Sequence, residues 1–280
     1  MIKPFQLGRN IINKILAPFG IEIIRLNRPD LLLYPELKRP EIPRYINIGA
    51  GSFYHPYWHN LDTPNDYYAD SQKGRLHIQY DLTSNQPLPF DDGTIKVAYT
   101  SHVIEHIHNE HVEHLFREVY RCLQPGGVFR ITCPDMDLEY DAFIRGDKDF
   151  WKEPNAYGVL SDSIEQRFLD HFATALTAAH PDKSSLKLTD DNVRDIFSSM
   201  PIDAAFNFII NTLSPDLQKS YPGDHINWFN YDKISSMLKS ANFEHVYESR
   251  YGQSRSPQLR NTQLFDSTCP GLSLYVECYK

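Results

Sequence analysis

The sequence predicts an α/β fold in which the strands of a mostly parallel sheet alternate with helices. From Tyr45 onward, short apolar runs alternate with polar stretches of helical periodicity, which is the pattern of βα units. The first run leads directly into Gly49-Ala50-Gly51, a turn that lets the backbone approach a ligand. A later stretch is amphipathic with a helical period and lies between two further apolar runs.

Each predicted strand is bounded by residues that interrupt strands, namely Gly, Pro, Asp or Asn. The first five strands are predicted at Tyr45–Ile48, a short piece ending at Asp62, Leu76–Tyr80, Ile95–Thr100 and Val128–Cys133. Between the last two, apolar residues recur every three or four positions and predict a helix over Asn109–Leu123. The run Gln124-Pro125-Gly126-Gly127 should stop this helix and turn the chain.

After the fifth strand, the alternating pattern is lost for residues 136–222, which we interpret as a helical insertion. The pattern then returns with a helix over Tyr231–Ala241 and two strands, Glu244–Tyr251 and Ser273–Tyr279. We therefore expect one α/β domain over residues 41–280, preceded by an N-terminal extension over residues 1–40.

Composition limits the function classes. The chain has 280 residues, a net charge of −8 and 41% hydrophobic residues, which excludes disordered classes and argues against a nucleic-acid partner. No run approaches the ~20 apolar residues that span a bilayer. The four cysteines form no CxxC pair and indicate reduced thiols, so we expect a cytoplasmic protein. Residues 1–30 are basic and predict a short amphipathic helix, which either packs on its own domain or makes a weak peripheral membrane contact.

Two carboxylates follow the glycine turn at the expected ends of later strands. Asp62 ends the second strand and Asp81 closes the third. Ligands of an open parallel sheet bind beyond the carboxyl ends of its strands, where these side chains can accept hydrogen bonds from ribose hydroxyls or an adenine amine. A dinucleotide motif would require glycine where the chain has Tyr54. The spacing therefore predicts a nucleoside-bearing ligand other than a nicotinamide dinucleotide.

These residues, in order and spacing, resemble the class I S-adenosylmethionine-dependent methyltransferases, and within them the small-molecule and sugar-modifying branch. The matching segments are Gly49-Ala50-Gly51, Asp62, Tyr80-Asp81-Leu82, Pro87-Leu88-Pro89-Phe90-Asp91-Asp92, Ser101-His102-Val103-Ile104-Glu105-His106 and Leu123-Gln124-Pro125-Gly126-Gly127. The resemblance implies a Rossmann-like sheet of seven mostly parallel strands with an antiparallel last strand. It also implies S-adenosylmethionine as the cofactor, bound by residues at the sheet edge: Asn47, Gly49, Ala50, Gly51, Asp62, Asp81, Leu82, Ser101 and His102.

The chain departs from the family pattern in two places. Asn47 stands where an acidic residue is common, and Phe53 replaces the third glycine of the turn. Only ten residues separate Gly51 from Asp62, so the first helix should be one turn or absent. The aromatic residues of this segment, Phe53, Tyr54, Tyr57 and Trp58, either wall the cofactor cleft or cover the sheet edge.

Five of the twelve histidines lie between His102 and His114. The sequence His102-x-x-Glu105-His106 satisfies a zincin pattern, and the same residues could hold a divalent cation; both are alternatives to an interpretation without a metal. In the main interpretation Ser101 and His102 line the cofactor pocket, and His108, His111 and His114 lie on a solvated helix face.

Methyl transfer from a sulfonium is an in-line displacement, so the protein mainly aligns donor and acceptor and excludes water. A hydroxyl acceptor also needs a base, for which the candidates are His225, His102 and Asp135. The insertion should form the lid of the acceptor pocket. Its aromatic residues either stack on a sugar or pack a helical core: Tyr140, Phe143, Phe150, Trp151 and Tyr157.

Arg255 and Arg260 could face an anionic acceptor such as a nucleotide sugar. The sequence thus predicts a methyltransferase acting on a small polar acceptor, with O-methylation of a saccharide or its precursor as the favoured reaction. The alternatives are a non-catalytic nucleoside-binding regulatory protein and a metal-dependent hydrolase using His102, Glu105 and His106.

Overall fold

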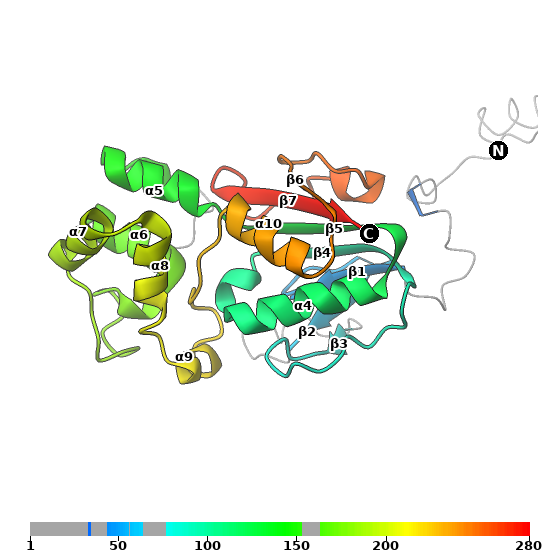
Figure 1. The fold of residues 1–280 in the computed structure, drawn as a ribbon, viewed down its shortest axis with the longest axis horizontal. Helices are drawn as coiled ribbons and strands as arrows, with labels where there is room; N and C mark the ends of the chain where they lie inside the picture. Colours follow the sequence, from blue (N-terminus) through cyan, green and yellow to red (C-terminus); the bar gives the residue numbers. More distant parts are fainter. Residues whose placement is uncertain (1–32, 35–43, 56, 64–76, 153–162) are drawn as a thin grey trace, which may run out of the picture. The chain divides into compact units, whose positions relative to one another are not determined.

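The computed structural model describes residues 33–34, 44–55, 57–63, 77–152 and 163–280 (Figure 1). The chain divides into two compact units, Met1–Pro40 and Glu41–Lys280. The basic helix predicted within residues 1–30 lies outside the described residues. No helix among the described residues has the length and apolar character needed to cross a membrane.

The second unit is built on one seven-stranded sheet, which confirms the predicted fold class. The strand order is β3-β2-β1-β4-β5-β7-β6. Strands β1 to β5 pair in parallel, and β7 runs antiparallel to both β5 and β6. The bounds are β1 Tyr45–Ile48, β2 His59–Asp62, β3 His77–Gln79, β4 Ile95–Ser101, β5 Leu123–Pro134, β6 His245–Glu248 and β7 Ser273–Tyr279. The carboxyl ends of β1 to β5 therefore share one edge.

Helices α4 (Asn109–Cys122) and α10 (Tyr231–Ser240) pack on one face of this sheet, close to the predicted ranges. Their apolar residues bury against alternate strand residues such as Ile46 and Ile48. The predicted turn after α4 is wrong in detail, because Leu123 to Gly127 already belong to β5. Strand β5 takes these residues up through a register shift opposite Ile95 and Val97 of β4.

Aromatic side chains cover the opposite face of the sheet. The Trp58 ring lies 4.9 Å from that of Phe265, and Tyr99 of β4 meets Phe265 edge-on at 5.1 Å. Phe53 also contacts Phe265, at 5.4 Å. Phe53 and Trp58 therefore pack over this face of the sheet, whereas the second of the two predicted roles placed them at its edge. Among the described residues between β1 and β2 there is no helix, as the short connection predicted.

The segment after β5 forms a separate hydrophobic cluster of helices. Its aromatic rings pack on one another: Phe143 stacks on Phe168 at 4.7 Å, and Phe206 stacks on Trp228 at 4.8 Å. The predicted aromatic residues that are described here thus build a helical core, as the second interpretation had it; Tyr157 lies outside the described residues. The helices of this segment are α5 Met136–Arg145, α6 Ile164–Ala173, α7 Asp190–Ser199, α8 Ile202–Ile210 and α9 Pro215–Ser220, with 3₁₀ turns at Phe150–Lys152 and Thr174–Leu176. Two further 3₁₀ turns lie outside it, at Ile104–His106 after β4 and at Pro257–Arg260 between β6 and β7.

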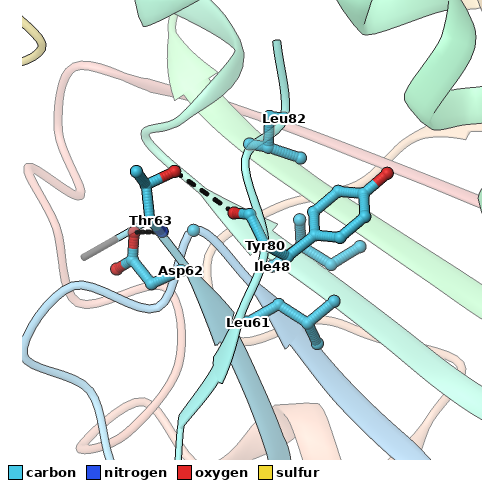
Figure 2. A pocket seen from close by; sticks show the side chains of 7 residues that line it. Ile48, Leu61, Asp62, Thr63, Tyr80 and Leu82 are labelled. Atoms are coloured by element: carbon cyan, nitrogen blue, oxygen red, sulfur yellow. Dashed lines mark hydrogen bonds between the residues drawn. The ribbon is translucent and has the colours of Figure 1, made fainter. Parts of the chain in front are cut away.

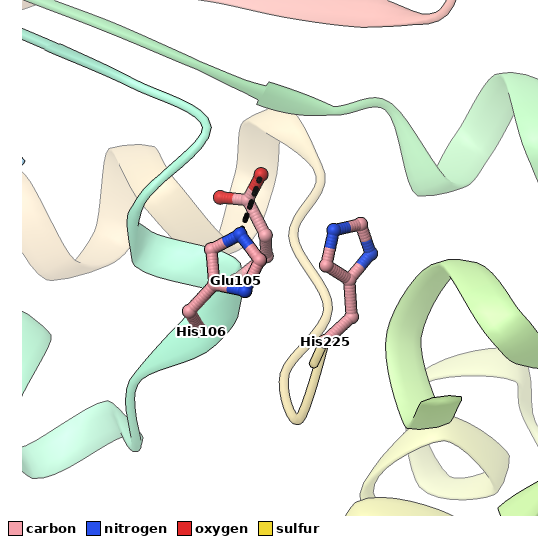
Figure 3. Close-up of side chains that lie close together, drawn as sticks. All are labelled: Glu105, His106 and His225. Atoms are coloured by element: carbon pink, nitrogen blue, oxygen red, sulfur yellow. Dashed lines mark ion pairs between the residues drawn. The ribbon is translucent and has the colours of Figure 1, made fainter. Parts of the chain in front are cut away.

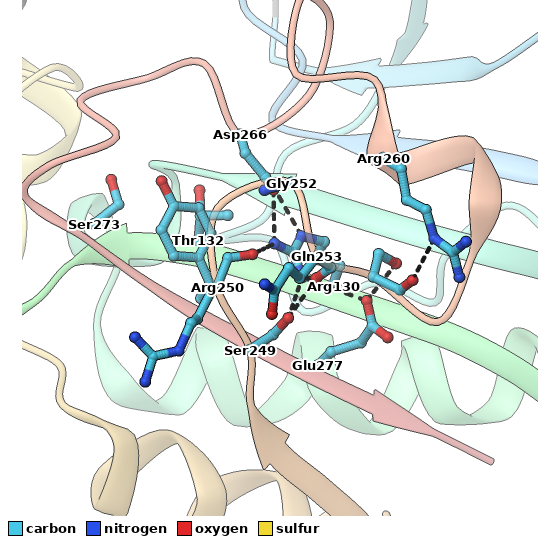
Figure 4. A network of polar contacts seen from close by, with 12 residues as sticks. Arg130, Thr132, Ser249, Arg250, Gly252, Gln253, Arg260, Asp266, Ser273 and Glu277 are labelled. Atoms are coloured by element: carbon cyan, nitrogen blue, oxygen red, sulfur yellow. Dashed lines mark hydrogen bonds and ion pairs between the residues drawn. The ribbon is translucent and has the colours of Figure 1, made fainter.

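A buried ionic network ties the loop between β6 and β7 to the centre of the sheet (Figure 4). Arg130 of β5 is fully buried and donates from Nε and Nη2 to the two carboxylate oxygens of Asp266, at 2.9 and 2.6 Å. Its Nη1 donates to the Gln253 carbonyl at 2.8 Å and lies 3.4 Å from Glu277. The two carboxylates compensate the buried guanidinium charge.

All four cysteines, Cys122, Cys133, Cys269 and Cys278, are free, as the sequence predicted, and all four are buried. Burial raises the pKa of Cys133 and Cys278 well above the usual thiol value, which keeps both thiols protonated and unreactive.

Candidate functional site

The glycine turn lies at the carboxyl end of β1. Gly49 and Gly51 both adopt left-handed backbone, with φ of +67° and +52°. The amides of Gly49 and Ala50 donate to the Leu61 carbonyl at 2.9 and 3.0 Å, so the turn is fastened to β2. A Cβ at Gly49 would lie 2.3 Å from a methyl group of Val103. Both the backbone conformation and this neighbour therefore require glycine at residue 49.

Asp62 lies directly against this turn. Its Oδ2 accepts the Gly51 amide at 2.5 Å and its Oδ1 accepts the Thr63 amide at 2.8 Å. Burial raises the pKa of Asp62, and the two backbone hydrogen bonds oppose that shift. These two amides hold the Asp62 carboxylate against the glycine turn.

A small pocket opens beside Asp62 at the ends of β1, β2 and β3 (Figure 2). Three of its residues, Gly49, Asp62 and Leu82, are among the predicted cofactor ligands, although they are far apart in the sequence. The pocket is lined by Ile48, Gly49, Leu61, Asp62, Thr63, Tyr80 and Leu82. It is therefore one part of the edge at which the cofactor was predicted to bind.

Sequence reasoning missed two polar residues of this pocket. Thr63 donates from Oγ1 to the Tyr80 carbonyl at 3.2 Å, which joins the ends of β2 and β3. The Tyr80 hydroxyl donates to the Gln86 carbonyl, and burial is the main cause that raises the Tyr80 pKa to about 12. Both residues directly follow a strand, and that position was the signal that would have included them.

Four predicted cofactor ligands have protein partners instead of lining this pocket, His102 among them. Asn47 is buried within the sheet and its amide faces Asn60 at 3.5 Å. Asp81 caps its own loop, accepting the Thr83 amide and hydroxyl, each at 2.8 Å. Ser101 shares a hydrogen bond of 2.8 Å with Thr132. Ala50 and Gly51 belong to the glycine turn, although the pocket wall does not include them.

Glu105, His106 and His225 converge at a second place, between the end of β4 and the segment that precedes α10 (Figure 3). Their ligating atoms all lie within 4.8 Å of one another. The carbonyl of Glu105 accepts the amides of Ile226 and Asn227 at 2.9 and 3.1 Å, which holds the His225 segment against the 3₁₀ turn. The sequence grouped Glu105 and His106 with His102; the structure brings His225 into the group.

His102 differs from the role that the zincin pattern requires. It has a left-handed φ of +53° and precedes a 3₁₀ turn of three residues, Ile104–His106. Its Nε2 contacts Ser273 at 2.8 Å and its Nδ1 lies 3.2 Å from Glu105. The pattern therefore does not lie on a continuous helix, as a zincin hydrolase would require.

The remaining candidates have well-defined partners. Asp135 caps α5: its Oδ1 accepts the Asp137 and Leu138 amides at 3.1 and 3.4 Å, while burial raises its pKa to about 6. His225 donates from Nδ1 to the His171 carbonyl at 2.7 Å, and burial lowers its pKa to about 3. His111 and His114 bond the loop residues Asn85 and Gln86, each at 3.0 Å, so they fasten this loop to α4.

The two arginines predicted to face an anionic acceptor, Arg255 and Arg260, make contacts within the protein instead. Arg255 lies over the Tyr279 ring at 4.1 Å, and Arg260 donates from Nε to the Ser254 carbonyl at 2.8 Å. Both stabilise the loop between β6 and β7.

The model of a methyltransferase domain family matches residues 59–131. No curated protein matches the chain. Among solved structures, an S-adenosylmethionine-dependent methyltransferase from Mesorhizobium loti is 13% identical, with 88% of this chain and 97% of that chain covered and a TM-score of 0.42. Another from Archaeoglobus fulgidus is 10% identical, with coverages of 97% and 94% and a TM-score of 0.40. Likenesses this low say nothing about the substrate of this chain.

Proposed function

We propose that this S-adenosylmethionine-dependent methyltransferase methylates a hydroxyl group of a small polar acceptor, a saccharide or saccharide precursor. The methyltransferase domain match over residues 59–131 supports the enzyme class that the sequence predicted. S-adenosylmethionine as the cofactor is what the resemblance of the edge motifs implies. The acceptor is our inference, and so are the roles of individual residues and an assignment to cytoplasmic polysaccharide biosynthesis.

The contact between Asp62 and the glycine turn is the main observation that supports a cofactor site at this edge. Gly51 donates its amide to Asp62 at 2.5 Å, which holds the carboxylate against the turn that Gly49 and Gly51 form at the end of β1. We propose that Asp62 accepts hydrogen bonds from the ribose hydroxyls of the cofactor. Leu82 and Tyr80 of the same pocket would then contact the adenine side.

Asp135 is the base that the geometry favours among the three candidates. It follows β5 at the same carboxyl edge, and its pKa of about 6 leaves it ionised at neutral pH yet more basic than an ordinary aspartate. Its Oδ1 already accepts two amides, and no hydrogen bond to Oδ2 is found among the described residues. Oδ2 is thus the atom that would accept the proton of the acceptor hydroxyl.

The other two candidates have both ring nitrogens directed to protein groups. His102 contacts Ser273 and Glu105, and His225 directs its second nitrogen toward Glu105 and His106. We therefore assign the proton transfer to Asp135 and give His102 a positioning role. The support for a saccharide acceptor is the resemblance of the edge motifs to the sugar-modifying branch.

Calorimetry and labelled methyl transfer test this function together. We expect micromolar binding of S-adenosylmethionine and S-adenosylhomocysteine, and transfer of labelled methyl groups to members of a panel of saccharides and nucleotide sugars. Binding without transfer to any acceptor would favour the non-catalytic nucleoside-binding alternative. Absence of cofactor binding would contradict the proposal.

A further inference from the structure

Glu105 is a buried carboxylate whose environment does not satisfy it. The residue is only 1% exposed, and within the described part of the chain neither of its oxygens accepts a hydrogen bond of normal geometry. The nearest side-chain nitrogens are His102 Nδ1 at 3.2 Å and His106 Nε2 at 4.0 Å from Oε1. Burying a carboxylate in this way is costly unless a cation or a set of donors compensates it.

The two histidines beside Glu105 present lone pairs, as their hydrogen bonds require. A backbone carbonyl can only accept, so His106 Nδ1 donates to the Asp224 carbonyl at 3.0 Å. In the same way His225 Nδ1 donates to the His171 carbonyl at 2.7 Å. In a neutral imidazole the other nitrogen, Nε2, is then an acceptor. Both Nε2 atoms thus carry lone pairs on the side of Glu105.

Three acceptors therefore converge with no donor among them. The arrangement matches that of metal-binding histidines, whose second ring nitrogen is held by a carbonyl or carboxylate that fixes the ring and its tautomer. His102 would play a related part for Glu105, because its Nδ1 approaches Oε1 while Ser273 holds its Nε2 at 2.8 Å. The backbone bonds from Ile226 and Asn227 to the Glu105 carbonyl keep the three ligands together.

We propose that Glu105, His106 and His225 bind one divalent first-row transition ion, of the class of Zn²⁺, Co²⁺ or Mn²⁺. Two imidazoles and one carboxylate suit these ions, whereas Mg²⁺ and Ca²⁺ prefer sites made of oxygen ligands. The three ligand atoms now lie within 4.8 Å of one another. Metal–ligand bonds of about 2.0–2.2 Å would draw these atoms closer together. The site does not depend on which acceptor the enzyme uses.

Cobalt provides a readout that is separate from methyl transfer. The full chain, freed of any affinity tag, is titrated with Co²⁺ and followed by visible absorption, and Zn²⁺ is added afterwards as a competitor. We expect one equivalent to bind, Zn²⁺ to displace it, and excess Mg²⁺ to leave it in place. The variants Glu105→Gln and His225→Gln should each lower the Co²⁺ affinity by roughly tenfold or more.

His245→Gln is the matched control, because His245 is exposed and stacks on Tyr279 at 4.4 Å. It should bind Co²⁺ as the unmodified chain does, and circular dichroism verifies that each variant is folded. If Glu105→Gln does not fold, His225→Gln decides. The proposal is overturned if the unmodified chain binds no Co²⁺ or Zn²⁺ in the micromolar range, or if folded Glu105→Gln and His225→Gln variants bind as tightly as the control.

Discussion

Replacing Arg130 by methionine should strongly destabilise the fold, because it removes the cation from a fully buried ionic network. Arg130 is 0% exposed and makes a two-pronged contact with Asp266 through Nε and Nη2, at 2.9 and 2.6 Å. Methionine retains much of the volume and the apolar stem, but it provides no donor. The Asp266 carboxylate would keep only the Gly252 amide, at 3.1 Å, among the partners found in the described residues.

The expected loss in the free energy of unfolding depends on which buried charge loses its partner. Glu277 retains the Ser254 hydroxyl at 2.5 Å and the Arg255 amide at 2.7 Å, so the loss falls mainly on Asp266. Breaking a buried ion pair from one side typically costs about 3–5 kcal/mol. With a urea m-value of about 3 kcal/mol/M, the unfolding midpoint should fall by roughly 1 M or more.

A double-mutant cycle measured by urea unfolding tests this reasoning. Asp266→Asn preserves the shape of the side chain and suits its left-handed φ of +58°, while it removes the charge. The double variant Arg130→Met/Asp266→Asn should therefore be less destabilised than the sum of the two single variants. A loss below about 1 kcal/mol for Arg130→Met, or strict additivity in the cycle, would refute the account of the network.

Three further predictions concern the candidate site. Asp62→Ala should weaken binding of S-adenosylhomocysteine by about 1–3 kcal/mol in calorimetry, since the ribose would lose charge-assisted hydrogen bonds; unchanged affinity would remove Asp62 from the cofactor site. Gly49→Ala should destabilise the fold by more than the roughly 1–2 kcal/mol of a left-handed backbone, because its Cβ meets Val103 at 2.3 Å. Adding Val103→Ala should restore only the part due to the clash, as thermal or urea unfolding would show, and complete recovery would contradict the backbone argument. Turnover should rise with pH around a midpoint of about 6, because Asp135 accepts a proton only when ionised; Asp135→Asn should abolish this rise, and a profile that it leaves unchanged would rule Asp135 out as the base.

The predictions that rested on short-range pattern agree with the structure. β1 and β7 have the predicted bounds, and α4 differs by one residue at its end. The hydrophobic period and the residues that interrupt helices and strands are sufficient to predict these elements, because each element buries one face and ends at residues that cannot continue it. The first part of β5 was missed, since the run from Gln124 to Gly127 has turn chemistry. It is held at the sheet by backbone hydrogen bonds of Gly126 and Gly127 with Lys280, which directly follows β7.

For the candidate site, too, some features could be predicted from local pattern and others could not. Proximity of the glycine turn to Asp62 could be predicted, because parallel strands end at one edge and the spacing sets which residues arrive there. The roles of individual edge residues could not, since Asn47 faces Asn60 within the sheet and Asp81 caps its own loop. The same holds for the histidines: a helical period grouped His102 with His106, whereas the observed backbone is left-handed at His102 and a 3₁₀ turn follows.

By itself, the sequence determined the α/β class, the positions of most strands along the chain and the sheet edge that carries the glycine turn and Asp62. These features depend on periodicity and on residues close along the chain. Only the tertiary structure decided that His225 joins Glu105 and His106 and that the aromatic residues of the insertion form its core. Those contacts join segments that are distant along the chain, and their geometry comes from packing and buried hydrogen bonds that no local pattern encodes.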